Sequence, residues 1–270
     1  MLSVVFYYVA PSRRRVAERN LELCFPELSE FEREQLLKAN FYSTAMAVFE
    51  SGMAWFWPRA RIQGLVQVEG LEILREHQAT GQGAIILSLH FTTLEIWGAT
   101  FSSNVDKLDM TYRPHRNKVY DYLQHRARGR ADSSDVVAAG DVRSMVKKLK
   151  QGRFVAYFPD QDYGKNHSVF APFFGVQAAT VTAMARMAKM AKVPVIPVMC
   201  VRKPGIEGYK AWVMPAWENY PSADDVENAT YLNAHVEKCV RMQPDQYLWV
   251  HRRFKTRPEG EGDLYRKTDR

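Results

Sequence analysis

Cysteine, long apolar runs and signature motifs are what this sequence has least of. Its three cysteines, Cys24, Cys200 and Cys239, lie far apart among 270 residues. They make neither a disulfide framework nor a metal cluster, and they suit a reducing compartment. The apolar opening MLSVVFYYVA, residues 1–10, is well short of the ~20 apolar residues that a membrane-spanning helix needs. It also lacks the basic start and the cleavage site of a signal peptide.

Catalytic and cofactor motifs are missing as well. The sequence has no G-x-S-x-G nucleophile elbow, no P-loop and no G-x-G-x-x-G, which argues against serine-elbow hydrolases, P-loop proteins and dinucleotide-binding proteins. It has no H-E-x-x-H pair of zinc-binding histidines either. We therefore expect neither a metal nor an organic cofactor.

Positive charge, in contrast, is in excess. The 37 lysines and arginines outnumber the 30 aspartates and glutamates, which gives a net charge of +7 and favours an anionic partner: nucleic acid, a phospholipid surface or an acidic protein. The basic residues gather in four clusters, RRRVAER (13–19), RPHRNK (113–118), HRARGR (125–130) and HRRFKTR (251–257). Because no zinc-finger spacing, RRM signature or heptad-linked basic region accompanies them, we expect no nucleic-acid partner.

Apolar segments alternate between the spacings of strands and helices. Strands are predicted at GAIILSL (83–89), KLDMTYR (107–113), RFVAYF (153–158), VPVIPVMCV (193–201) and YKAWVM (209–214). Helices are predicted over 29–57, from Thr92, at DVRSMVKKLKQG (141–152) and at TVTAMARMAKMAK (180–192). This alternation predicts an α/β fold with a mixed, mostly parallel central sheet flanked by helices.

The predicted helix over 29–57 has a marked start and a marked end. Ser29 stands three places before Glu32, as in a capping box, and Pro58 follows the stretch GMAWFWP. Core packing is the default interpretation of the three aromatics at 55–57, and an aromatic belt at a membrane interface is the alternative.

The stretch LSLHFTTLEIWG, residues 87–98, carries the first candidate for chemistry. On one ideal helix His90 and Glu95 would lie about 140° apart. They can converge if His90 sits in the turn after the strand and Glu95 in the first helical turn. A neutral imidazole held by a carboxylate is a suitable general base for a hydroxyl. The competing interpretation is a capping box, Thr92-x-x-Glu95, without any chemical role.

Two more polar segments follow predicted strands. Arg113, in YRPHRNK (112–118), has forked donors that suit a phosphate. Asp160 and Asp162 lie in the loop YFPDQDYGKNHSVFAPFFG (157–175), where aspartates usually cap turns.

Seven blocks together resemble the late acyltransferases of lipid A biosynthesis, the lauroyl/myristoyl acyltransferase family of Gram-negative bacteria, and look closest to the lauroyl branch. They are RNLELCFPELSE (19–30), ESGMAWFWP (50–58), HFTTLE (90–95), YRPHRN (112–117), PDQDYG (159–164), VFAPFFGVQAATVT (169–182) and YLWVHRRFKTRPEG (247–260). The resemblance implies a glycerolipid-acyltransferase-like fold. It also implies transfer of a fatty acyl chain, with lauroyl favoured, from acyl carrier protein to a hydroxyl on an acyl chain of the di-Kdo lipid A precursor.

The resemblance also assigns roles to residues. The family's His-x4-Asp/Glu pair falls on His90, as general base, and Glu95, as its orienting partner. Arg113 is assigned to the substrate phosphate or the oxyanion, and Asp160 to the polar framework of the site. The alternatives are a myristoyl-specific enzyme, a related lipid hydrolase or thioesterase in which His90 activates water, and a non-enzymatic module that binds anionic lipid.

The implied setting is the cytoplasmic face of the Gram-negative inner membrane, with acyl carrier protein, the anionic acceptor lipid and the membrane surface as partners. We expect one acyltransferase domain over residues 1–270, in which residues 1–60 form a basic, aromatic-rich, helical region next to the membrane. Family members usually carry a transmembrane helix before the basic segment, and we expect none in this sequence. Residues 1–15 and the basic clusters are then expected to bind the surface.

Overall fold

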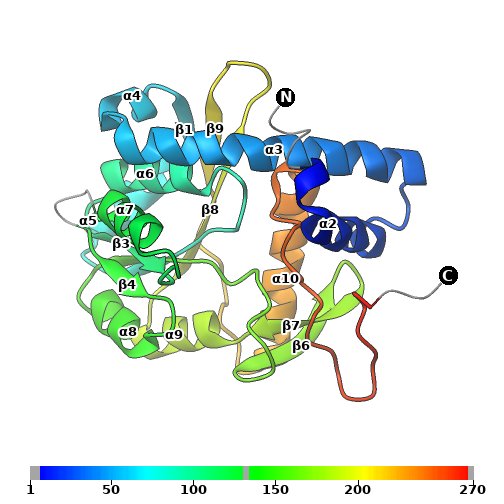
Figure 1. Ribbon diagram of the computed structural model, residues 1–270. Coiled ribbons are helices and arrows are strands. Elements are labelled where there is room, and N and C mark those ends of the chain that lie inside the picture. Colours follow the sequence, from blue (N-terminus) through cyan, green and yellow to red (C-terminus); the bar gives the residue numbers. More distant parts are fainter. Residues whose placement is uncertain (1–6, 130–133, 267–270) are drawn as a thin grey trace.

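A computed structural model describes residues 7–129 and 134–266 (Figure 1). Part of the apolar opening at residues 1–10 and the last residue of the basic cluster at 125–130 therefore lie outside the described residues. None of the described helices combines the length and the apolar character needed to cross a membrane.

The centre of the fold is a sheet with the strand order β1-β9-β8-β2-β5-β3-β4. Neighbouring strands are parallel except β8 and β9, so the expected mixed, mostly parallel sheet is confirmed. A separate antiparallel hairpin is formed by β6 and β7. The strands are β1 (Val66–Glu69), β2 (Ala84–Leu87), β3 (Leu108–Tyr112), β4 (Val136–Ala138), β5 (Phe154–Tyr157), β6 (Ser168–Phe173), β7 (Val176–Val181), β8 (Val195–Arg202) and β9 (Tyr209–Val213).

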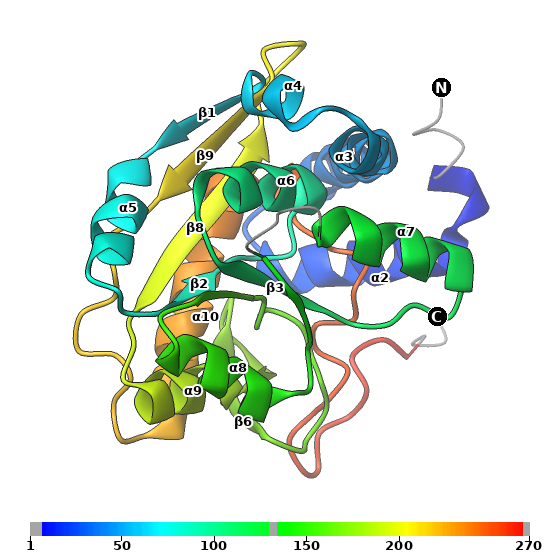
Figure 2. The ribbon, with the colours of Figure 1, turned by 90° about the vertical axis from the view of Figure 1, so that its left-hand side faces the viewer.

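Helices cover both faces of this sheet (Figure 2). The helices are α2 (Pro11–Cys24), α3 (Glu30–Phe56), α4 (Arg59–Gln63), α5 (Leu71–Ala79), α6 (Leu94–Asn104), α7 (Lys118–Arg128), α8 (Val142–Lys150), α9 (Ala183–Ala191) and α10 (Asp225–Met242), followed by the short 3-10 helix η1 (Pro244–Gln246). The expected helix over 180–192 was too long at its start, because Thr180 and Val181 belong to the hairpin strand β7.

Strand β2 shows how the two layers of core arise. Ile85 and Leu87 belong to the core layer that contains residues of α2, α8, α9 and α10, whereas Ala84 and Ile86 belong to the layer that contains residues of α4, α5 and α6. Successive side chains of a strand point to opposite faces of the sheet, so a strand covered on both faces has to be apolar throughout. The unbroken apolar run that predicted this strand is the direct consequence.

Helix α3 begins and ends where the sequence predicts. The Ser29 side chain accepts a hydrogen bond from the Glu32 amide at 3.3 Å, and the Glu32 carboxylate accepts one from the Ser29 amide at 2.8 Å, which completes the capping box. Full core burial, the default interpretation of the aromatics at 55–57, is wrong for Phe56, which is 64% exposed.

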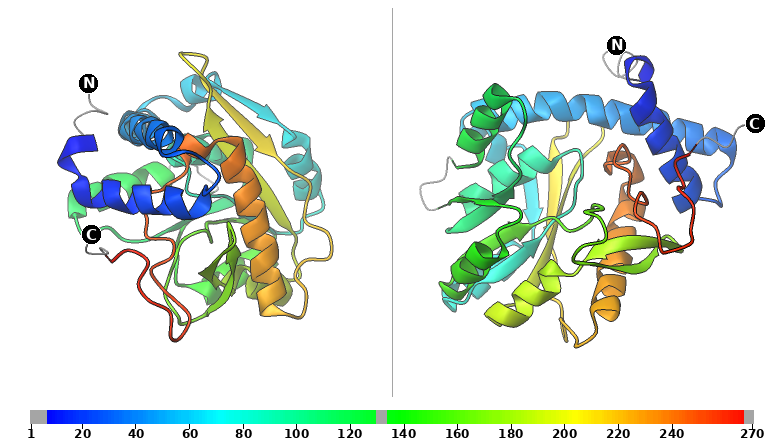
Figure 3. Two further views of the ribbon diagram at one scale, coloured as in Figure 1. Left: turned by 90° about the vertical axis from the view of Figure 1, so that its right-hand side faces the viewer. Right: turned by 60° about the horizontal axis from the view of Figure 1, so that its bottom comes forward.

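The hairpin and α10 were not predicted, and together they support the C-terminal segment (Figure 3). The Asn233 amide of α10 donates to the carbonyl of Pro172 in the hairpin at 3.0 Å. The buried guanidinium of Arg253 donates to the carbonyl of Ala179 in β7 at 2.7 Å and to the side-chain oxygen of Asn233 at 3.2 Å. These contacts hold the chain after α10 against the hairpin.

Candidate active site

Two neighbouring parallel strands bring His90 and Asp160 together. Leu87 of β2 is in register with Tyr157 of β5, and each of the two polar residues stands three places beyond its register partner. The carboxyl ends of parallel strands meet at one edge of a sheet, which is where open α/β sheets commonly place their sites. The strand order therefore positions this pair.

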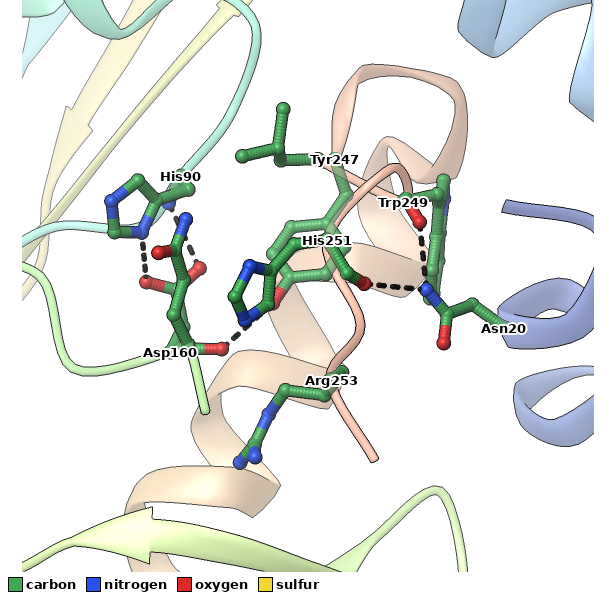
Figure 4. A pocket seen from close by; sticks show the side chains of 9 residues that line it. Asn20, His90, Asp160, Tyr247, Trp249, His251 and Arg253 are labelled. Carbon is green, nitrogen blue, oxygen red and sulfur yellow. Dashed lines mark hydrogen bonds and ion pairs between the residues drawn. The ribbon is translucent and has the colours of Figure 1, made fainter. Parts of the chain in front are cut away.

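The pair makes two hydrogen bonds (Figure 4). His90 Nδ1 lies 2.6 Å from Asp160 Oδ1, and the His90 backbone amide donates to Asp160 Oδ2 at 2.9 Å. The carboxylate is fully buried, whereas the imidazole is 19% exposed. Burial alone would raise the pKa of Asp160, but the charge and the hydrogen bonds of His90 outweigh it and lower the pKa. An ionised carboxylate only accepts, so Nδ1 carries the proton, and Nε2, which points away from Asp160, is left as a base.

Glu95 is not the orienting partner of His90 in this structure. Its carboxylate lies 2.5 Å from the Arg128 guanidinium and accepts from Trp55 Nε1 at 2.9 Å and from the Gln124 amide at 3.5 Å. Burial acts to raise the pKa of Glu95, and the charge and hydrogen bonds of Arg128, with those of Trp55 and Gln124, lower it overall. The expected His90–Glu95 pairing is thus replaced by His90–Asp160.

The capping-box interpretation of the same segment is not found either. The N-cap of α6 is Thr93, without a side-chain cap hydrogen bond. The Thr93 hydroxyl donates to the Cys200 carbonyl at 2.6 Å instead, and the Thr92 hydroxyl is buried without a partner. Glu95 sits on the first turn of α6 facing α3 and α7, so its carboxylate joins three helices.

A small pocket opens beside the imidazole (Figure 4). The lining residues come from α2, the loop after β2, the loop after β5 and the C-terminal segment: Asn20, His90, Asp160, Gln161, Tyr247, Leu248, Trp249, His251 and Arg253. The C-terminal segment is tied to the His90 loop, because the Leu248 amide donates to the His90 carbonyl at 3.0 Å and the Thr92 amide donates to the Gln246 carbonyl at 2.7 Å. The sequence block YLWVHRRFKTRPEG carried the resemblance, but no role was assigned to its residues.

A second histidine, His251, lines this pocket without being a base of the same kind. Its Nε2 accepts a hydrogen bond from the Asp162 amide at 3.1 Å. Burial, together with the nearby His90, lowers the pKa of His251 to about 4, so its imidazole is neutral near pH 7. Asp162 caps the turn, as its position predicts, because its carboxylate accepts from the amides of Gly164 and Thr256, each at 2.8 Å.

Arg113 lies at the same edge of the sheet. It follows β3, the other neighbour of β5, and its side chain is exposed. Its charge acts on Tyr163 of the Asp160 loop: burial of the hydroxyl and the charge of Asp160 raise the pKa of Tyr163, and Arg113 opposes that rise. The exposed guanidinium at this edge of the sheet has forked donors that suit a phosphate or a carboxylate.

The amides of three residues at or just before the start of α6 are engaged in backbone hydrogen bonds. The Phe91 amide donates to Leu89, the Thr92 amide to Gln246 and the Leu94 amide to Phe91. Among the residues that the structure describes, no group of three or more histidine, cysteine, aspartate or glutamate side chains could hold a metal ion.

Another pocket lies between α3, α6 and α7. It is lined by Ala54, Trp55, Glu95, Gly98, Ala99, Ser102, Met110, Ala127 and Arg128. The Glu95–Arg128 ion pair forms its polar wall and small side chains of α6 form much of the rest. Arg128 was not singled out from the sequence. It lies within the basic cluster at 125–130, and nothing in that cluster indicates that one of its arginines pairs with a buried carboxylate.

Comparison with known proteins completes the description of the site. Residues 1–256 match the family described as "Bacterial lipid A biosynthesis acyltransferase". The chain is 44% identical over 255 residues to the lipid A biosynthesis lauroyltransferase of Escherichia coli K12, covering 94% of this chain and 82% of that one. It is 41% identical over 254 residues to the palmitoleoyltransferase of the same strain, with the same coverage. It is 31% identical over 258 residues to the myristoyltransferase, covering 96% and 80%.

These matches exclude the non-enzymatic interpretation, because the family and the relatives are acyltransferases. The family match over residues 1–256 includes the site residues and almost all of the sequence blocks. The chain belongs to the bacterial lipid A biosynthesis acyltransferase family and is an acyltransferase.

Proposed function

We propose that this protein transfers a fatty acyl chain from acyl carrier protein to a hydroxyl of an acyl chain on the di-Kdo lipid A precursor. The observation that carries the proposal is the His90–Asp160 pair at the edge of a pocket, with its free ring nitrogen directed away from the carboxylate. A thioester is activated enough that deprotonation of the acceptor hydroxyl is the main task, so no covalent enzyme intermediate is needed.

His90 is the general base in this proposal. Its Nε2 takes the hydroxyl proton as the oxygen attacks the thioester carbonyl, and the C–O bond forms while the C–S bond breaks. The proton then passes from the imidazolium to the departing thiolate, so that an ester and a free thiol result. Asp160 holds the Nδ1–H tautomer and stabilises the imidazolium.

Arg113 is assigned to the negative charge of the substrates. The exposed guanidinium at the catalytic edge suits either a phosphate of the acceptor or the oxyanion, a charge whose stabilisation is often the largest contribution to acyl transfer. Glu95 contributes by fixing α3, α6 and α7 around the second pocket.

Lauroyl is the proposed donor chain. The identity to the lauroyltransferase, 44%, exceeds the 31% to the myristoyltransferase. The 41% identity to the palmitoleoyltransferase makes palmitoleoyl the competing donor.

The proposed setting is the cytoplasmic face of the inner membrane of a Gram-negative bacterium, with residues 1–60 next to the membrane as part of one acyltransferase domain. Acyl carrier protein is acidic and the acceptor is a phosphorylated lipid, so the net charge of +7 favours both partners.

The test is a transfer assay with a panel of acyl carrier protein thioesters on the di-Kdo precursor, read by mass spectrometry. We expect one added acyl chain on the acceptor, with lauroyl preferred over palmitoleoyl and myristoyl. A radiolabelled donor separates transfer from hydrolysis: label released as free fatty acid at the rate of donor use, with none on the lipid, would show a thioesterase and overturn the proposal.

A further inference from the structure

Two of the four basic clusters meet on helix α7. The cluster at 113–118 leads into the start of the helix, and the cluster at 125–130 begins in its last turn. Across both clusters and the residues between them, the one acidic residue is Asp121. Its carboxylate accepts hydrogen bonds from the Tyr112 hydroxyl at 2.9 Å and from the His115 amide at 2.7 Å. The helix therefore carries an excess of positive charge, and its one carboxylate is engaged by neighbouring groups of the chain.

Helix α7 has an inner and an outer side. The inner side holds it to the protein, because Arg128 binds Glu95 at 2.5 Å and the Tyr120 ring meets the Trp55 ring of α3 at 5.2 Å. Figure 2 shows α7 at the surface of the molecule, next to α6. Its outer positions recur at i, i+1, i+4, i+7 and i+8, so they lie on one side of the helix. We call this side the α7 basic face; it consists of Lys118, Val119, Tyr122, His125 and Arg126, together with Arg116 just before the helix.

The α7 basic face is open to solvent. Val119 is 69% exposed and Tyr122 is 62% exposed, and the side chains of Arg116, Lys118 and Arg126 are exposed as well. Within residues 7–129 and 134–266, none of these three cations has an ion-pair partner. Their charges are therefore available to an anionic partner outside the chain.

The start of α7 carries charge of the sign that a helix start disfavours. The amino end of a helix bears a partial positive charge, so cations next to it oppose the helix dipole. Arg116 and Lys118 stand on the two sides of the N-cap residue Asn117, whose side chain accepts from the amides of Val119 and Tyr120. This arrangement does not stabilise the helix. It concentrates positive potential at one place on the surface, which favours the approach of an anion.

This positive potential lies at the catalytic edge of the sheet. Helix α7 follows β3, which is the neighbour of β5, and Asp160 follows β5. The ion pair between Arg128 and Glu95 holds the other end of α7 to the first turn of α6, the helix that follows His90 in the chain. A partner bound to the α7 basic face is thus held beside the His90–Asp160 pair.

We infer that the α7 basic face docks acyl carrier protein and thereby delivers the acyl thioester to His90. The inference rests on the proposed function, which has acyl carrier protein as the donor. Lys118 and Arg126 lie about 12 Å apart along the helix axis, with Val119 and Tyr122 between them. Cations at both ends of a helix, with apolar side chains between, are complementary to an acidic helix of a partner protein. Tyrosine and arginine are also enriched at protein–protein interfaces.

Other occupants fit the α7 basic face less well. A second copy of this chain would bring like charges together, which costs affinity. A helix that lies in a bilayer needs a broad apolar face, and two apolar side chains among cations do not supply one. The anionic acceptor remains a partner that the same charges could attract, so the experiment measures donor and acceptor separately.

The test compares R116E/K118E with wild type in the transfer assay and in direct binding of lauroyl acyl carrier protein. Neither side chain makes a hydrogen bond with the described part of the chain. Glutamate at a helix start agrees with the dipole, so the variant should unfold at the wild-type temperature or above it. We expect a KM for the donor at least roughly tenfold higher than in wild type, with kcat at saturating donor and KM for the acceptor unchanged. Added salt should weaken donor binding by wild type and reduce the difference.

K147E/K150E is the matched control, because it changes the net charge by the same amount. Both lysines are exposed in the last turn of α8, which leads to the amino end of β5 and thus to the opposite edge of the sheet. This variant should use the donor like wild type. A donor KM raised equally by the two variants would overturn the inference, because net charge and not the α7 basic face would then set donor affinity.

The outcomes also separate this inference from the proposed function. If R116E/K118E and wild type transfer the acyl chain with the same donor KM, the inference is overturned and the proposed function stands. A raised acceptor KM with an unchanged donor KM overturns the inference as well, since the face would then bind the lipid. If wild type binds the carrier protein and R116E/K118E does not, but wild type transfers no acyl chain, the proposed function fails and the docking surface stands.

Discussion

Two buried carboxylates of this protein are held by partners of different kinds. Asp160 is held by the His90 imidazole at 2.6 Å, and Glu95 by the Arg128 guanidinium at 2.5 Å. In both, partner charge and hydrogen bonds outweigh burial and lower the pKa of the carboxyl. The difference lies in the partner, because an imidazole can accept a proton from a substrate and pass it on, whereas a guanidinium stays charged.

That difference indicates a chemical role for the first pair and a structural role for the second. The His90–Asp160 pair borders a pocket and leaves a ring nitrogen unused by the carboxylate, so it can accept a proton from a substrate. In the Glu95–Arg128 pair the carboxylate also accepts hydrogen bonds from α3 and α7, and the pair fixes helices around a second pocket. The comparison predicts that substitutions in the first pair act on turnover and those in the second act first on stability.

His90→Ala should have the largest effect. It removes the proposed base and leaves the Asp160 carboxylate buried without its imidazole partner, and we expect kcat to fall by roughly 10³- to 10⁴-fold. Rates of acyl transfer, with thermal unfolding to show that the fold is kept, measure it. Turnover near that of wild type in a folded His90→Ala protein would contradict the assignment of catalysis to the His90–Asp160 pair.

Asp160→Asn should rank second, with kcat lowered by roughly 10²- to 10³-fold. An amide that donates toward Nδ1 favours the wrong imidazole tautomer, so Nε2 would carry the proton and no longer act as a base. Nitrogen-15 NMR of the ring measures the tautomer directly. Asp162→Asn is the matched control, because Asp162 is buried in the same loop but caps a turn; it should lose stability while the His90 tautomer stays as in wild type.

The sequence predicts the sheet and the candidate base but not the pairing. Each strand around the site is visible as an apolar run, and His90 directly follows one of them. Asp160 lies 70 residues away from His90 along the chain, and the two meet only because β2 and β5 are neighbours while β2 and β3 are not. Strand order is decided by long-range packing. Glu95 was expected to be the partner of His90 because it is near in the sequence, but the residue that contacts His90 is Asp160.

The contribution of the C-terminal segment to the pocket could not be predicted from the sequence for a related reason. Tyr247 and His251 lie in a block without strand or helix periodicity, and hydrogen bonds from Asn20 of α2 to the carbonyls of Trp249 and His251, at 2.7 and 2.8 Å, hold it at the pocket. Such backbone anchoring leaves no periodic pattern. The capping box of α3 was predictable because all of its atoms lie within four residues.

Glu95→Gln should lower stability more clearly than chemistry. It leaves the Arg128 guanidinium buried without a carboxylate, and we expect a loss of about 3 to 5 kcal/mol in the free energy of unfolding. Turnover should fall about tenfold, well short of the effect of His90→Ala. Denaturant unfolding of Glu95→Gln, Arg128→Gln and the double variant measures the coupling. Additive losses in this cycle would show that the ion pair does not act as a unit.

Mild acid should distinguish the two regions by the smallest effect. His251, in the pocket beside His90, has its pKa lowered to about 4 from an ordinary value of 6.5. Between these values the unfolded chain binds a proton that the folded protein excludes, so stability falls as the pH falls through this window and is unaffected above it. The two carboxylates, whose pKa values are lowered, lose their contribution to stability only at lower pH.

His251→Gln should reduce the loss of stability between pH 6.5 and pH 4 by on the order of 1 kcal/mol, whereas Glu95→Gln should leave the pH dependence in this range as in wild type. Denaturant unfolding across the pH range decides it, with His235→Gln as a control remote from both pairs, since burial lowers the pKa of His235 to about 4 as well. A slope changed by Glu95→Gln and not by His251→Gln would place the acid-sensitive group beside Arg128 and reverse the assignment.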